Sequence, residues 1–247
     1  MSGRSYTAFA ASYDGLMADG NYRRRAAYLI RELRKSAASV QTVLDLACGT
    51  GSLTCLLAEQ GFSVIASDAS EDMLTQAAQK AAYLSHPPLF LRQSMPRLRL
   101  TGPVDAAVST LDSLNYLTRE RDLAETFRHV RKWLKPGGPF LFDVNTPHKL
   151  RRMDRQTYMD DAGESFCVWQ TFFSEKTQIC TYQVDLFQQR PDGAWNRTFE
   201  EHRERAWPQE FLVDQLRRAG FSTVRVSGDL TRRPPKPDED RWQFLAV

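Results

Sequence analysis

The sequence has few cysteines, no long apolar run and little net charge. Its four cysteines, at positions 48, 55, 167 and 180, form no CxxC pair and no metal-ligand spacing, which argues against a disulfide scaffold or a zinc module. No run approaches the roughly 18 apolar residues of a membrane span, so no membrane partner is expected. The N-terminal residues lack the apolar core of a secretory signal, which favours a cytoplasmic protein.

Composition and charge are those of an ordinary globular protein. Hydrophobic residues make up 42% of the 247 positions and charged residues 26%, so the chain can bury the core of one sizeable domain, with or without an insertion. A formal charge of +3 is too small to indicate nucleic acid by itself.

Short apolar runs alternate with helical stretches over the first 150 residues. The expected strands are 42–46, 62–66, 89–91, 104–110 and 140–144, and the expected helices are 22–35, 52–60, 70–83 and 119–134. This alternation predicts an α/β fold, in which a parallel sheet is covered on both faces.

The pattern changes from about residue 150. Three longer segments with a period of two follow without helices between them, at 166–174, 178–188 and 196–207. They predict an antiparallel insertion of about three strands. A helix over 208–218 and strands over 224–227 and 242–247 are expected to complete the chain.

A glycine turn follows the first expected strand and is the most informative local feature. Gly49 and Gly51 allow a tight turn and a close approach of the backbone to a ligand, although tight strand–helix junctions also use glycine without any ligand. Asp68 ends the next expected strand. Because neighbouring parallel strands end at the same edge of a sheet, an acid there can bind the two hydroxyls of a ribose.

Two residues of this loop argue against a dinucleotide. The fingerprint G-x-G-x-x-G requires a third glycine where this chain has Thr54. Asp45 places a negative charge where a diphosphate would need positive partners. An acid there suits a ligand with a cation, such as the amino group of S-adenosylmethionine (SAM).

Several motifs resemble those of class I SAM-dependent methyltransferases: residues 45–51 (DLACGTG), 67–74 (SDASEDML) and 134–138 (LKPGG). Residues 111–117, 142–150 and 199–206 are similar to a bacterial subgroup of small-molecule enzymes related to sugar N-methyltransferases and glycine N-methyltransferase.

The resemblance implies a Rossmann-like, seven-stranded mixed sheet in the order 3-2-1-4-5-7-6, with the last strand antiparallel. It also implies an N-terminal helical lid and an antiparallel β insertion after the fifth strand. Residues 1–150 and 206–247 would then form the SAM-binding domain, with the lid at 1–40. Residues 151–205 would form the insertion that covers the substrate site.

The same resemblance implies a SAM site. Its expected residues are Tyr6, Tyr22, Asp45, Leu46, Ala47, Gly49, Gly51, Asp68, Ala69, Met73, Gln93, Ser94, Met95, Ser109 and Leu111. Ala47 replaces a frequent glycine of the family, which implies an ordinary backbone angle at this position. Ser94 replaces a frequent aspartate, so it would accept from the adenine amino group without a charge.

Methyl transfer needs a general base only if the acceptor must lose a proton. Asp112, His202 and Tyr13 are the expected catalytic residues. Each has a simpler alternative: Asp112 as a helix cap, His202 on a solvated strand face, and Tyr13 as packing in the N-terminal helix. No metal site is expected.

The leading hypothesis is a SAM-dependent methyltransferase acting on a nitrogen or oxygen of a small molecule. Three alternatives stay open: an RNA (tRNA) methyltransferase of the same fold, a nicotinamide-dependent oxidoreductase, and a non-catalytic SAM-binding protein. Aromatic residues of the insertion would cover its inner face or form a homodimer contact. These residues are Trp169, Phe172, Phe173, Tyr182 and Phe187.

Overall fold

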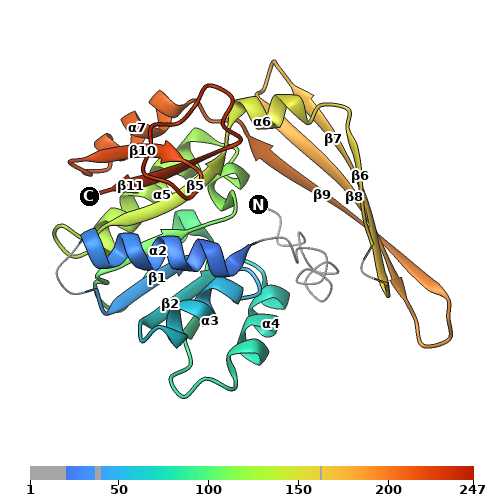
Figure 1. Ribbon diagram of the computed structural model, residues 1–247, viewed down its shortest axis with the longest axis horizontal. Coiled ribbons are helices and arrows are strands. Elements are labelled where there is room, and N and C mark those ends of the chain that lie inside the picture. The colour runs from blue at the N-terminus through green and yellow to red at the C-terminus, as the bar shows by residue number, and fades with distance from the viewer. Residues whose placement is uncertain (1–20, 37–39, 162) are drawn as a thin grey trace.

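A seven-stranded sheet forms the centre of the molecule (Figure 1). The computed structural model describes residues 21–36, 40–161 and 163–247. The strands are β1 (Thr42–Leu46), β2 (Ser63–Asp68), β3 (Leu89–Arg92), β4 (Ala106–Ser109), β5 (Phe140–Asn145), β10 (Val224–Gly228) and β11 (Arg241–Ala246). Their order is β10-β11-β5-β4-β1-β2-β3, and β11 is antiparallel to both of its neighbours. The predicted strand order and the antiparallel last strand are therefore confirmed.

Helices cover both faces of this sheet. They are α2 (Tyr22–Ser36), α3 (Ser52–Glu59), α4 (Glu71–Ala81), α5 (Glu120–Trp133) and α7 (Gln209–Arg218). Successive side chains of β1 enter different cores, because neighbours on a strand point to opposite faces. Val43 packs in a cluster with Leu29 and Leu57 of α2 and α3, whereas Leu44 belongs to the cluster that contains Phe127 of α5. No helix within the described residues is long and apolar enough to span a bilayer.

The insertion contains more structure than predicted. Its elements are α6 (Pro147–Arg152), β6 (Thr157–Asp161), β7 (Ser165–Ser174), β8 (Ile179–Gln189) and β9 (Trp195–Arg205). The strands form a separate antiparallel sheet in the order β6-β7-β8-β9, so the expectation of three strands becomes four. The helix α6 was not predicted; Thr146 is its N-cap, and the Thr146 hydroxyl accepts a hydrogen bond from the N–H of Lys149.

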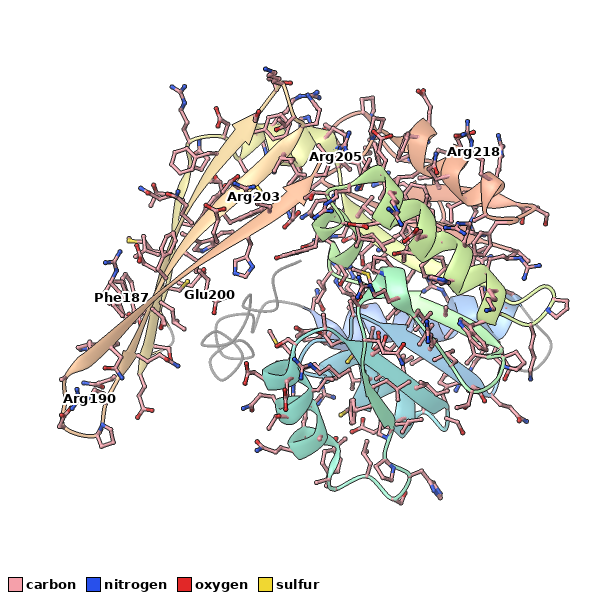
Figure 2. The ribbon with its side chains drawn as sticks, turned by 180° about the vertical axis from the view of Figure 1, so that it is seen from behind. Phe187, Arg190, Glu200, Arg203, Arg205 and Arg218 are labelled. Carbon is pink, nitrogen blue, oxygen red and sulfur yellow. The ribbon has the colours of Figure 1, made fainter. Side chains whose placement is uncertain are left out.

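The insertion sheet extends away from the larger sheet and presents two different faces (Figures 1 and 2). We call the face that carries Glu200, His202 and Glu204 the inner face, because its side chains reach the carboxyl ends of the larger sheet. The opposite face, which carries Phe187, is the outer face. Figure 2 shows Phe187 and Glu200 on these opposite sides.

Candidate active site

The glycine loop connects β1 to α3 and has the expected geometry. Gly49 and Gly51 adopt φ angles of +54° and +73°, in the left-handed region that favours glycine. A Cβ at Gly51 would stand 2.8 Å from the Cβ of Ala77 on α4. Only glycine therefore fits between the loop and this helix.

Ala47 corrects one expectation. Its φ is +61°, whereas an ordinary angle was predicted for this position. An L-residue in this region costs about 1 kcal/mol or more relative to a right-handed angle. Leu111 and Asp112 also have positive φ, at 55° and 56°. Such backbone strain persists only where surrounding contacts impose it, and it concentrates at functional sites.

Two acidic side chains lie at the carboxyl ends of β1 and β2. Asp45 is 2% exposed and accepts a hydrogen bond from the Thr54 hydroxyl, so the position of the missing third glycine holds the acid in place. Burial raises the pKa of Asp45 to about 6; the Thr54 hydrogen bond opposes this shift, and the charge of Asp68 adds to it. A cationic ligand would relieve the repulsion between these two carboxylates.

Asp68 joins the glycine loop to the start of α4. One carboxylate oxygen accepts from the N–H of Gly49 at 2.9 Å, and the other accepts from the N–H of Ser70 at 2.9 Å. Burial raises the pKa of Asp68, although these hydrogen bonds counteract the rise. A carboxylate offers about four acceptor positions, so Asp68 can also accept from a ligand hydroxyl.

A cleft opens between the glycine loop and the segment after β4. Its lining residues include Tyr22, Asp45, Ala47, Gly49, Thr110, Leu111 and Ser113. β1 and β4 are neighbours, and their following connections cross to opposite sides of the sheet. Ligands of open α/β sheets bind at such a switch point, outside the carboxyl ends of the strands. The cleft thus unites five of the predicted cofactor residues: Tyr22, Asp45, Ala47, Gly49 and Leu111.

The residues predicted to surround the adenine have mixed environments. Ala69 is exposed at the end of β2, whereas Met73 and Met95 are 3% and 6% exposed. The Gln93 side chain is engaged with the backbone N–H and C=O of Arg99, at 2.6 and 2.9 Å. Ser94 is half-buried directly before a 3-10 helix.

Four other predicted residues lie deeper in the fold or outside the described residues. Leu46 belongs to the apolar core, and Ser109 is fully buried at the end of β4. Tyr6, Tyr13 and most of the predicted lid lie outside the described residues, so their predicted roles have no structural counterpart here.

A buried charge cluster supports the far side of the cleft. Asp143 on β5 accepts from the backbone N–H groups of Leu111 and Asp112 at 3.1 and 3.0 Å, and it is ion-paired with Arg25 and Arg241. Burial favours the neutral carboxyl, but the two guanidinium groups prevail and hold the pKa of Asp143 below its usual value. Asp143 therefore fixes the strained loop that lines the cleft.

Asp112 does not cap the following helix, as one alternative predicted. One carboxylate oxygen lies 2.6 Å from the Arg241 guanidinium. Asp112 stands at the N-cap position of the 3-10 helix η3 (Ser113–Tyr116), but its side chain makes no capping hydrogen bond. The side chain binds the last strand of the sheet and holds the loop in place.

His202 reaches the same region from the insertion. Its side chain is 6% exposed, so the alternative of a solvated strand face is wrong. The imidazole meets the ring of Tyr116 edge-on at 6.1 Å, and its Nε2 lies 3.3 Å from the Glu200 carboxylate. The inner face of the insertion thus contacts the segment that follows β4.

Amide side chains join the insertion to the larger sheet. The Asn115 carboxamide accepts from the N–H of Asn145 and donates to the carbonyls of Asn145 and Arg205. The Asn145 Nδ2 donates to Glu204 at 2.8 Å. Glu204 is 3% exposed, and burial, with the charge of Asp112 nearby, raises its pKa to about 8.

Three residues of this region were not predicted from the sequence: Arg25, Arg241 and Glu204. Arg25 and Arg241 converge on Asp143 from positions 118 and 98 residues away in the sequence. No local pattern indicates such contacts. Glu204 had one available signal: it shares the period-two face of β9 with His202.

The chain matches known methyltransferases over nearly its whole length. A family model described as a methyltransferase domain matches residues 43–138. The protein YqeM of Bacillus subtilis (strain 168), named as a methyltransferase without a stated substrate, is 35% identical over 98% of this chain and 96% of its own length.

Solved structures show the same architecture. A SAM-dependent methyltransferase from Clostridium acetobutylicum ATCC 824 matches with a TM-score of 0.88 at 28% identity, covering 98% of both chains. The sugar N-methyltransferase KedS8 from Streptoalloteichus sp ATCC 53650 matches with a TM-score of 0.78 at 19% identity, covering 94% of this chain and 89% of its own, which shows the shared fold. With its glycine loop, its two strand-end acids and these full-length matches, the chain belongs to the class I SAM-dependent methyltransferases.

Proposed function

We propose that the acceptor is a small molecule with a nucleophilic nitrogen, bound between the cofactor cleft and the inner face of the insertion. The observation that carries this proposal is the contact of His202 with Tyr116. It brings the inner face of β9 onto the segment that follows Leu111 and Ser113 of the cleft. An acceptor between these elements would be shielded from bulk water.

The polar side chains that β9 places on the inner face favour an amine as the acceptor. Glu200, His202 and Glu204 follow one another on this face of β9, and Tyr182 is paired with His202 across the sheet. Carboxylates and aromatic rings both attract cations, so they suit the ammonium form in which amines arrive. Relatives named for amine substrates agree with this class: a glycine/sarcosine/dimethylglycine N-methyltransferase from Actinopolyspora halophila is 32% identical over 49% of this chain and 22% of its own.

Within the cleft, we propose that Asp45 lies beside the amino group of SAM and that Asp68 accepts from the ribose hydroxyls. Gly49 and Gly51 would allow the close approach of the backbone, and Met73 would pack on the adenine side. Buried carboxylates that repel each other fit a cofactor with positive charge. SAM supplies a methyl group that its sulfonium has already activated.

The protein's part in the reaction is to position the nitrogen and remove a proton. The nitrogen lone pair forms the new N–C bond while the S–C bond breaks and its electron pair stays on sulfur. An ammonium acceptor must first lose a proton, and we propose that the His202 imidazole accepts it, with Glu200 stabilising the resulting cation. We assign Asp112 a positioning role, because Arg241 holds its carboxylate.

The affinity for S-adenosylhomocysteine (SAH) is expected to weaken as the pH falls below about 6. Asp45 must be ionised to bind the ligand's amino group, and its pKa is raised to about 6, so acid protonates it and removes the attraction. The loss should approach tenfold per pH unit. Titration calorimetry from neutral to acidic pH measures this slope, and an Asp45→Asn variant should bind weakly with little slope over the same range. A wild-type affinity independent of pH would contradict the assignment of Asp45.

A screen for transfer of labelled methyl groups tests the acceptor class. Purified enzyme with labelled SAM is incubated in parallel with amine-rich metabolite fractions, amine-free fractions and total RNA. Label in the amine fraction is the expected result. Label in RNA alone would replace the small-molecule acceptor with the RNA alternative, and label in the amine-free fraction alone would indicate an oxygen nucleophile.

A further inference from the structure

The outer face of the insertion carries a contiguous apolar surface near its free end. Its members occupy neighbouring rows of the sheet register: Met159, Phe166, Val168, Phe187, Trp195 and Phe199. We call this set the outer apolar surface. Met159, Trp195 and Phe199 are 69%, 46% and 54% exposed, which is high for large apolar side chains.

Part of this surface is hollowed. Phe166, Phe187 and Trp195, with Asp161 and Gly163, line an open groove of about 350 Å³. The rings of Phe166 and Phe187 lie 6.1 Å apart and are tilted by 42°. Soluble monomers rarely expose contiguous apolar patches of more than a few hundred Å², and larger ones mark interaction sites.

Four charged side chains of this face form two ion pairs, and Asp161 in the groove adds one carboxylate. Asp185 and Arg197 form an ion pair at 2.7 Å, and Glu201 and Arg203 form another at 3.0 Å. The face is therefore nearly neutral, and its described residues include no cluster of basic side chains that would attract RNA or an anionic lipid surface. A nearly neutral surface can face its own copy without like-charge repulsion.

The position of the surface also suits self-association. The insertion sheet extends away from the larger sheet, and Phe187 points to the side opposite Glu200 (Figure 2). Two copies can approach through their outer faces while both cofactor clefts stay open. The edge strand β9 is a poorer contact, because residues 200–205 place charged side chains or histidine at every position.

We propose that the outer apolar surface packs face to face against the same surface of a second copy, about a twofold axis. A twofold contact needs a patch that complements itself, and aligned sheets pack about 10 Å apart through apolar side chains. The whole outer face, with β7, β8 and β9 of about ten residues each and β6 of five, presents roughly 600 Å² of flat area. With side-chain relief this approaches the ~800 Å² per partner of a standard interface.

Sedimentation velocity at micromolar concentrations tests this interface. The wild-type chain, of 28.3 kDa, is expected to sediment with twice that mass. In a Met159→Lys, Phe199→Lys double variant, like charges would meet across the twofold axis, so it should sediment as a monomer. Because both side chains are exposed, its thermal unfolding and its SAH binding should match those of the wild type.

Tyr83→Lys is the matched control: Tyr83 is 68% exposed, and it follows α4 of the larger sheet, outside the insertion, so this variant should leave the dimer intact. Trp195→Lys, at the free end of the sheet, serves as a second monomeric variant if the double variant does not fold. A wild-type chain that remains a monomer, or a double variant that remains a dimer, would overturn the proposal. Co-sedimentation of monomers with phosphatidylcholine vesicles would also overturn it, in favour of a lipid surface.

Discussion

Replacing Arg241 with methionine is expected to lower the free energy of unfolding by about 3 kcal/mol or more at neutral pH. Arg241 is buried between the carboxylates of Asp112 and Asp143, and it is the first residue of β11. Methionine would fill much of the space but would leave two buried carboxylates close together. Of its two ion pairs, Asp143 would keep the longer one, with Arg25 at 3.4 Å. Urea denaturation at neutral pH measures the loss.

Arg152→Met is the matched control for this substitution. Arg152 also pairs with an aspartate, Asp240 at 2.6 Å, but both side chains are exposed. Exposed ion pairs contribute about 0–1 kcal/mol, so this variant should stay near the wild-type stability. Equal losses of stability in the two variants would show that the buried charge cluster contributes no more to folding than an exposed ion pair does.

The same cluster connects stability to the cofactor cleft. Asp143 binds the N–H groups of Leu111 and Asp112, and Leu111 lines the cleft. In the folded fraction of Arg241→Met, the affinity for SAH should therefore fall as well, whereas Arg152→Met should bind normally. A variant that lost stability but kept full affinity would confine the role of Arg241 to folding.

Replacing His202 with alanine is expected to lower kcat by about 100-fold or more while leaving the affinity for SAH within twofold. His202 contacts Tyr116 and Glu200 but does not line the cofactor cleft. The acceptor found in the labelled-transfer screen is the substrate for this measurement.

His148→Ala controls for the loss of an imidazole, because His148 is exposed on α6. It should retain the kcat of the wild type. If His202→Ala lowers stability and raises KM while kcat stays near the wild-type value, His202 packs against Tyr116 and does not accept a proton. Unchanged kcat would remove it from the reaction altogether.

The sequence predicted the larger sheet well, because its strands are short apolar runs. Glycine and capping residues also mark the ends of the helices between them. Gly61 follows α3, and Ser70 caps α4, where its hydroxyl accepts from the N–H of Met73. β6 was not predicted, because its five residues show no clear alternation of apolar and polar side chains. Even its apolar Met159 is 69% exposed. α6 was missed because its six residues give fewer than two helical turns.

The cofactor loop was predictable for a different reason: its residues are close in sequence and their types are constrained by geometry. Gly51 shows this, since a Cβ there would meet Ala77. The backbone conformation of Ala47 could not be predicted, because an alanine side chain gives no indication of a φ of +61°. The partners of Asp143 lay beyond prediction, because they are brought together only by the complete fold.

Calorimetric titration of the Asp68→Ala variant with SAH tests most directly the claim that the strand-end acids bind the nucleoside. A charge-assisted contact of about 1.5–3 kcal/mol corresponds to at least a tenfold weaker affinity. Ser70→Ala removes a cap at the same helix start but no carboxylate, so it should lose less than about threefold. An Asp68→Ala protein that stays folded and binds SAH as tightly as the wild type would contradict the proposed nucleoside site.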